Sequence, residues 1–245
     1  MPFISSTTSA YGYGRNAVLD YDIFYKNTVL LLHMNGANSS TNFIDSSKYN
    51  RSVTAFGGAS ISTAQYKFGG ASGQFNNIDS YLTVDHNNDF DFSTGDWTIE
   101  FFCNINPVET DILINKSLGL GFYGYQVRIV NNRFSIKGYG TNFIPNLVYE
   151  LGDDVGPIVT PNTWYHVAAA RQASNFYLYI DGNLIDSTTS NSNLYNSPGP
   201  LSIGGTSDGQ GLTAGYIDEV RITKGVCRYP NGAAFPLPTS QFRDG

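Results

Sequence analysis

Cysteine and charged side chains are both scarce in this chain of 245 residues. It contains two cysteines, Cys103 and Cys227, which are too few for a disulfide framework. Cys103 lies within an apolar segment, where a buried thiol behaves as a small hydrophobic group. Charged residues make up 14% of the sequence, a fraction that argues against a solvated helical or disordered protein. These absences predict a folded domain without disulfides, made in a reducing compartment.

Clustered basic residues, long apolar runs and an export signal are missing as well. The formal net charge is −6, so phosphate backbones and anionic membranes would repel the chain. The longest strongly apolar run, residues 29–32, is far too short to span a bilayer. Residues 1–15 have neither the basic start nor the apolar core of a signal peptide. We therefore expect no nucleic-acid partner, no membrane insertion and no signal peptide.

Aromatic residues and glycine are abundant instead. The chain has 17 Tyr, 16 Phe and 26 Gly, a composition typical of many short strands joined by tight turns. The clearest strand is residues 97–105, where Phe102 points to the face opposite the other large apolar side chains. That opposite face should therefore be partly covered. The apolar side chains that share the first face are Trp97, Ile99, Phe101, Cys103 and Ile105.

The remaining segments fit an antiparallel all-β sandwich. Residues 29–34 predict a strand buried on both faces. Asn131-Asn132 and Asp181-Gly182 predict two tight hairpins. We expect residues 140–162 to form an extended loop, and the proline-containing C-terminal tail to run extended over the surface. No segment keeps a helical apolar period over three turns, which favours a sandwich.

Four segments carry a family pattern in this order along the chain. They are residues 30–36 with 45–47, residues 95–101, residues 162–168 with 178–182, and residues 215–222. Together they resemble the laminin-G-like family of concanavalin A-like lectin/glucanase jelly rolls. The resemblance implies an antiparallel two-sheet jelly-roll sandwich over residues 28–245, with an extended N-terminal arm (1–27) and an extended C-terminal tail.

The ending of the sequence is more specific. Residues 221–229, leading to Phe235-Pro236 and Pro238, are similar to the ending of laminin-G-like domains in tailed-bacteriophage structural proteins. This resemblance implies a virion protein assembled in the host cytoplasm. The arm is rich in aromatic residues, so we expect it to order against other virion proteins or a second copy in a homo-oligomer. The alternative is that the arm packs back on its own jelly roll.

Catalytic groups are not where a jelly-roll glycosidase needs them. Such enzymes carry carboxylates at alternate positions of one strand. The nearest match is Glu109 and Asp111, with Leu113 in place of a third carboxylate. Asp218 and Glu219 are adjacent, so they should point to opposite faces of a strand and cannot form the pair. His166 fits a packed core histidine. We expect no catalytic residues and no enzymatic activity.

Asp218 is the candidate metal ligand. By the alternation of a strand it shares a face with Tyr216, Val220 and Ile222. That face should point inward, and a buried carboxylate needs partners. The resemblance implies a structural Ca²⁺ near this strand, and Asp45 and Asp79 are candidate co-ligands. The alternative is that Asp218 accepts hydrogen bonds from backbone amides or pairs with an arginine.

The resemblance also implies a glycan ligand, because jelly-roll lectins stack sugars on surface aromatics. The candidates are Tyr123, Tyr125, Tyr177 and Tyr179. The overall prediction is a non-catalytic bacteriophage virion protein, either a capsid decoration or a tail or fibre component, that binds host or environmental glycans. Two alternatives stay open: a free carbohydrate-binding lectin and a glycoside hydrolase.

Overall fold

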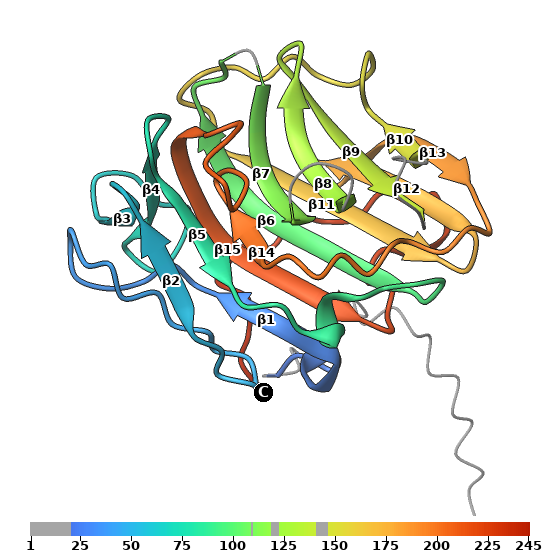
Figure 1. Cartoon of the computed structure of the whole chain (residues 1–245), viewed down its shortest axis with the longest axis horizontal. Coiled ribbons are helices and arrows are strands. Elements are labelled where there is room, and N and C mark those ends of the chain that lie inside the picture. The colour runs from blue at the N-terminus through green and yellow to red at the C-terminus, as the bar shows by residue number, and fades with distance from the viewer. Residues whose placement is uncertain (1–20, 109, 119–122, 141–146) are drawn as a thin grey trace, which may run out of the picture.

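Two antiparallel sheets pack face to face in the computed structural model, which describes residues 21–108, 110–118, 123–140 and 147–245 (Figure 1). The predicted all-β jelly-roll sandwich is therefore confirmed. The eight-stranded sheet runs β13-β12-β11-β6-β15-β4-β3, with β1 also paired to β15, and the seven-stranded sheet runs β10-β9-β8-β7-β14-β5-β2.

The strands of the eight-stranded sheet are β1 (Thr28–Leu32), β3 (Ser60–Ser62), β4 (Ser72–Asn76), β6 (Trp97–Ile105), β11 (Tyr165–Gln172), β12 (Asn175–Ile180), β13 (Asn183–Thr189) and β15 (Ala214–Lys224). Those of the seven-stranded sheet are β2 (Val53–Phe56), β5 (Tyr81–Val84), β7 (Thr110–Ser117), β8 (Tyr123–Val130), β9 (Arg133–Tyr139), β10 (Leu147–Leu151) and β14 (Leu201–Ile203). The described helices are single 3-10 turns, η1 (Tyr25–Asn27), η2 (Asn88–Phe90) and η3 (Pro230–Gly232), and none is long or apolar enough to cross a membrane.

Alternation along the strands builds the core between the sheets. All nine residues of β6 are buried, and its five predicted inward side chains lie in the main apolar cluster. Phe102 points the other way and packs with Leu31 and Phe242 in a second cluster. Strand β1 is also buried throughout, since Leu30 and Leu32 face the core and Leu31 faces this second cluster. Both predictions of two-sided burial are confirmed.

The two predicted hairpins are confirmed by their backbone angles. Asn131 and Asn132 join β8 to β9 with φ of 51° and 57°, and Asp181 and Gly182 join β12 to β13 with φ of 49° and 74°. Positive φ at both central residues matches the right-handed twist of the flanking strands. The prediction of a loop throughout residues 140–162 is wrong, because β10 forms the edge of the seven-stranded sheet there. The sequence of this segment has no clear alternation of apolar and polar residues, and it forms a strand because it pairs with β9.

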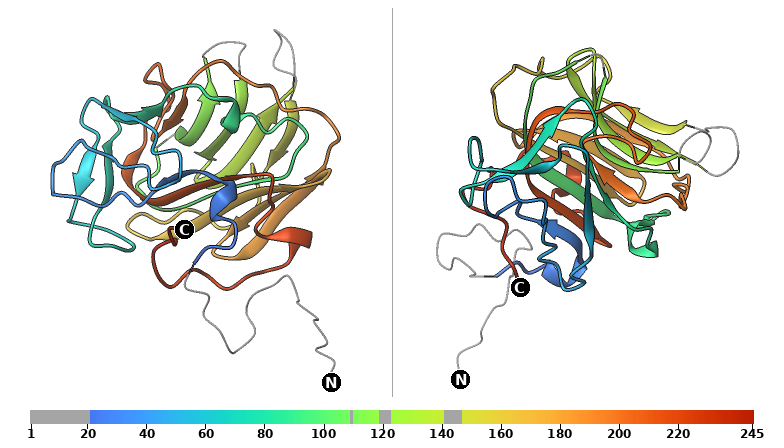
Figure 2. Two further views of the ribbon diagram at one scale, coloured as in Figure 1. Left: turned by 90° about the horizontal axis from the view of Figure 1, so that it is seen from below. Right: turned by 60° about the vertical axis from the view of Figure 1, so that its left-hand side comes forward.

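The chain itself covers the outer face of the eight-stranded sheet. The C-terminal tail and residues 21–27 run along the same side, and Gly245 lies against the ring of Tyr25 (Figure 2). Tyr229 and Phe235 stack at 3.5 Å above this face. The last part of the predicted arm thus packs on its own jelly roll, and residues 1–20 lie outside the described residues.

A buried ionic cluster fastens these segments. Glu100 of β6 is fully buried and accepts hydrogen bonds from Arg221 Nε (3.0 Å), Tyr229 Oη (2.6 Å) and His166 Nε2 (3.2 Å). Arg228 forms a two-pronged pair with Asp22, at 2.7 and 3.0 Å. Arg221 and Arg228 belong to residues 221–229, so this part of the C-terminal motif has a structural role. His166 is the packed, hydrogen-bonded histidine that the sequence predicted.

Candidate functional site

The outer face of the seven-stranded sheet carries one polar residue from every strand, side by side. Direct Cα pairing links Thr54, Thr83, Ser202, Asn115, Gln126, Lys137 and Glu150 across β2, β5, β14, β7, β8, β9 and β10. Neighbours of these residues along each strand point into the core, among them Leu82, Ile203, Val127 and Ile136. Because side chains alternate across a strand, the seven polar residues share the outer face. We call them the polar row.

Hydrogen bonds join the middle of the polar row. Asn115 Nδ2 donates to Ser202 Oγ at 3.1 Å, and Gln126 Nε2 donates to Asn115 Oδ1 at 2.9 Å. These three side chains are buried, whereas Thr54 is exposed. The middle of the row is therefore an internal hydrogen-bond network, and the exposed hydroxyl of the row is that of Thr54.

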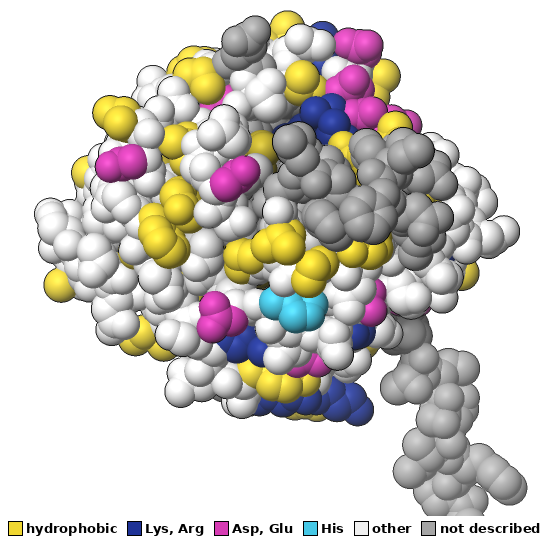
Figure 3. Space-filling model, in the orientation of Figure 1, with side chains coloured by type: hydrophobic (Ala, Val, Ile, Leu, Met, Phe, Trp, Pro, Cys, Tyr) yellow, Lys and Arg dark blue, Asp and Glu magenta, His cyan; other side chains and the backbone are white. Residues whose placement is uncertain are grey.

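Charge is confined to the β10 end of the row. Glu150 pairs with Arg128 of β8 and lies 4.0 Å from Lys137 Nζ. Arg128 also pairs with Asp153 at 3.2 Å. Burial lowers the pKa of Lys137, which Arg128 lowers further. The rest of the row is uncharged, and the face seen in Figure 3 shows mostly uncharged side chains.

An exposed aromatic pair lies beside the other end of the row. Phe56 of β2 and Tyr81 of β5 are directly paired residues, two positions along from Thr54 and Thr83. Their rings stack at 4.7 Å with an interplanar angle of 7°. The side chain of Phe56 is 39% exposed. Together these two residues, which we call the aromatic platform, present apolar ring surface next to the hydroxyl groups of Thr54 and Thr83.

The tyrosines predicted to stack on sugars lie elsewhere. Tyr125 is buried in the core, where it stacks on Phe92 at 4.9 Å. Tyr179 is fully buried under the C-terminal tail and donates its hydroxyl to the carbonyl of Tyr229. Tyr177 is 9% exposed in the same aromatic cluster, and the side chain of Tyr123 lies outside the described part. The prediction is therefore wrong for Tyr125 and Tyr179, because strand parity turns one inward and the tail covers the other.

Asp218 does not share a face with Val220 and Ile222. Glu219 has a φ of +52° at a β-bulge, where the pairing of β15 with β6 shifts between Asp218 and Arg221. One extra residue in the bulge reverses the alternation, so Asp218 and Glu219 both lie toward the outer face. The predicted inward orientation of Asp218 is thus wrong.

The three carboxylates predicted to bind calcium are not brought together. Asp45 is saturated by hydrogen bonds from its own loop and β1, including the amide nitrogens of Leu31 (3.0 Å) and Arg51 (2.8 Å). Asp79 is exposed and accepts from Gly58 N. No group of three or more His, Cys, Asp or Glu side chains that could hold a metal occurs among the described residues.

Asp218 itself accepts hydrogen bonds from backbone amides, which is one part of the predicted alternative to metal binding. Its Oδ2 accepts hydrogen bonds from the amides of Lys67 (2.8 Å) and Phe68 (3.1 Å). Burial raises the pKa of Asp218 to about 7. Its Oδ1 has no hydrogen-bond partner, and neither does Asn35 Oδ1, which lies against Gly69 in the same turn. Calcium at Asp218 therefore stays a prediction, without Asp45 and Asp79 as co-ligands.

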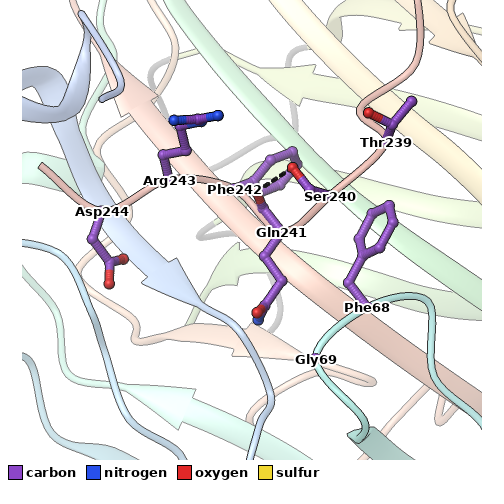
Figure 4. Close-up of a pocket in the computed structure, with 8 residues that line it drawn as sticks. All are labelled: Phe68, Gly69, Thr239, Ser240, Gln241, Phe242, Arg243 and Asp244. Carbon is purple, nitrogen blue, oxygen red and sulfur yellow. Dashed lines mark hydrogen bonds between the residues drawn. The ribbon is translucent and has the colours of Figure 1, made fainter. Parts of the chain in front are cut away.

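The C-terminal end is clamped beside this turn. Phe68, Gly69 and residues 239–244 line an open pocket of about 600 Å³ (Figure 4). Glu219 accepts hydrogen bonds from Phe242 N (2.9 Å) and Gln241 Nε2 (3.1 Å). His33 contacts Glu219 through Nδ1 and Asp244 through Nε2, both at 2.9 Å.

Glu109 and Asp111, the nearest match to a glycosidase pair, are described only at Asp111. Asp111 is fully buried, accepts from Val108 N at 2.9 Å and has a pKa that burial raises to about 6. Glu109 lies outside the described residues. At the β10 end of the outer face, Glu150 and Asp153 are engaged by Arg128.

Comparison with known proteins agrees with this fold. The model of the concanavalin A-like lectin/glucanases superfamily matches residues 75–227, which is more than half of the chain. The chain therefore belongs to this superfamily and is a lectin-like jelly-roll domain. No curated protein matches its sequence.

Among solved structures, similar folds occur in toxin binding domains. The binding domain of Paraclostridial Mosquitocidal Protein 1 matches with a TM-score of 0.67 and 16% identity, over 84% of this chain and 51% of that one. The botulinum neurotoxin serotype G binding domain matches with a TM-score of 0.63 and 16% identity, over 82% and 49%. A structure of botulinum neurotoxin type C, whose cell entry depends on interaction with two ganglioside molecules, matches with a TM-score of 0.58 and 15% identity, over 83% and 49%. The chain thus spans about half the length of these structures, and the likeness concerns the fold.

Proposed function

We propose that this chain is a non-catalytic carbohydrate-binding module that holds glycans on the outer face of its seven-stranded sheet. The observation that carries the proposal is the aromatic platform beside the polar row. A pyranose ring has an apolar face that can pack on an exposed aromatic ring, and it has hydroxyl groups that can hydrogen-bond to the hydroxyls of Thr54 and Thr83. The ganglioside interaction of the type C neurotoxin is consistent with a glycan ligand for this fold.

The outer face of the eight-stranded sheet is a poorer candidate. Its apolar side chains are already covered by Phe235, Phe242 and Tyr229 of the tail. Its charged groups satisfy one another within the Glu100 and Asp22 cluster. A ligand on that face would have to displace the tail, whereas Phe56 is exposed without any rearrangement.

Binding of immobilised neutral and acidic oligosaccharides by Phe56→Ala and Tyr81→Ala variants tests the proposal. Each change should weaken binding about 2- to 10-fold, since an aromatic contact contributes roughly 0.5–1.5 kcal/mol. Tyr66→Ala is the matched control, because Tyr66 is 49% exposed and belongs to neither the platform nor the polar row. If both platform variants bind as the wild type does, the site is wrong. If the wild type binds no oligosaccharide, the function is wrong.

We further propose that the module is displayed on a bacteriophage particle, as a capsid decoration or a tail or fibre component. The support is the sequence of residues 221–238, which is similar to the ending of phage laminin-G-like domains. Attachment would then rest on residues 1–20 and not on the whole predicted arm, because Asp22 and Tyr25 pack on the jelly roll. A free lectin remains the second candidate, and incorporation into a particle separates the two.

A further inference from the structure

Two carboxylates flank the aromatic platform. Asp79 lies against Gly57, the residue that follows Phe56: a Cβ at Gly57 would lie 2.4 Å from the Asp79 carboxyl carbon. Hydrogen bonds from Gly58 N and Asn76 Nδ2, both 3.0 Å, hold this exposed carboxylate in place. The same bonds lower the pKa of Asp79, so it is ionised at neutral pH.

The second carboxylate comes from the turn after β14. Gly209 lies beside the ring of Tyr81, since a Cβ there would be 4.0 Å from Tyr81 Cε1. The preceding residue, Asp208, is exposed and accepts a hydrogen bond from Thr206 Oγ1 at 2.5 Å. Gln210 N donates to the same hydroxyl at 2.8 Å, which fixes the turn. Each ring of the platform therefore has an acidic residue in an adjacent turn.

Cations of this face are distant from the platform and already engaged. Arg128, Arg133 and Lys137 lie on β8 and β9 and contact Glu150, Asp153 or the carbonyl of Gly156. Strand β8 is three positions from β5, or about 14 Å at the usual strand spacing. That distance exceeds the screening length of about 8 Å at physiological salt. Among the described residues, an anionic sugar on the platform would meet two carboxylates and no compensating cation nearby.

From this arrangement, and resting on the proposed glycan-binding function, we infer that the aromatic platform selects neutral glycans and rejects those with a carboxylate or sulfate group near the stacked ring. The apolar contact with Phe56 and Tyr81 favours any pyranose. Asp79 and Asp208 supply the discrimination, because like charges brought together on binding repel. The same carboxylates can accept hydrogen bonds from the hydroxyls of a neutral sugar.

The test uses the full chain and a matched pair of immobilised oligosaccharides, one neutral and galactose-terminated and the other capped with one sialic acid. At low salt the capped chain should bind about fourfold more weakly, because each carboxylate roughly 8 Å away in water contributes about a twofold effect. The difference should vanish in high salt and in the Asp79→Asn/Asp208→Asn double variant. Asp153→Asn, at the opposite end of the face, is the matched control and should keep the full difference.

The possible outcomes distinguish a failure of the selection for neutral glycans from a failure of glycan binding itself. Equal or tighter binding of the capped chain by the wild type would overturn the inference and leave glycan binding standing. A difference that persists in the double variant would also overturn it, since the discrimination would then come from another part of the face. Binding of neither chain, nor of other neutral oligosaccharides, would remove the proposed function itself.

Discussion

Glu100→Gln should destabilise the domain strongly, although it changes the shape of the side chain very little. Glu100 is fully buried and faces Arg221 and Arg228, whose guanidinium groups would lose their central counter-charge. Removing one partner of a buried ion pair costs about 3–5 kcal/mol, because the remaining charge stays desolvated. For a chain of this size, each kcal/mol lowers Tm by about 2–4 °C. The expected loss is therefore about 6–20 °C.

Glu150→Gln is the matched control. Glu150 also pairs with an arginine and a lysine, but its side chain is 25% exposed, so its loss should cost no more than about 1 kcal/mol. Thermal unfolding followed by circular dichroism would compare the two variants with the wild type. An equal or smaller Tm loss for Glu100→Gln than for Glu150→Gln would refute the reasoning that burial makes the Glu100 cluster the stronger one.

The pH dependence gives a second check on Glu100. Burial by itself would raise its pKa, but Arg221, His166 and Arg228 hold it well below the ordinary value of 4.5. A carboxyl with a depressed folded-state pKa contributes stability that is fully present above its unfolded pKa and lost as pH falls toward the folded value. The advantage of the wild type over Glu100→Gln should thus be constant from pH 6 to 8 and shrink below about pH 4.5.

Three further predictions concern the clamp, the turn and the N-terminal segment. Burial by itself would lower the pKa of His33, but Glu219 and Asp244 raise it from 6.5 to about 9. The contribution of protonated His33 to the free energy of unfolding is therefore fully present below pH 6.5 and lost as pH rises through 9. His33→Gln should flatten the fall in Tm between pH 7 and 10, and an unchanged pH profile would contradict this. If Asp218 holds calcium, added calcium should raise the Tm of the wild type and chelator should lower it, and neither should change the Tm of Asp218→Asn. A wild-type Tm that changes with neither calcium nor chelator would rule the ion out. Deletion of residues 1–20 should leave Tm unchanged and abolish incorporation into the particle. Deletion of residues 1–27 should also lower Tm, because it removes Asp22 from its pairs with Arg228 and Arg221. Normal incorporation of the chain that lacks residues 1–20 would contradict the attachment role.

Local chemistry was enough to predict much of the fold. The alternation from Trp97 to Ile105 predicted which side chains enter the core, and Phe102 predicted that the opposite face is covered. Asn131-Asn132 and Asp181-Gly182 predicted the hairpins, because few residue pairs adopt two consecutive positive φ angles easily. Each of these signals is contained within a few neighbouring residues, where the period of a strand and the sterics of a turn apply directly.

The candidate site depended on the tertiary structure. Thr54 and Glu150 lie at opposite ends of one row because seven strands pair in a particular register, and no local pattern specifies that register. Strand parity alone would pair Asp218 with Val220, but the bulge at Glu219 reverses the alternation. Tyr179 is an ordinary strand tyrosine in the sequence, and the tail over it makes it a buried one. Strands and turns follow from patterns local to the sequence. Which of their side chains remain free to bind depends on burial and on the alignment of distant segments, which are long-range properties.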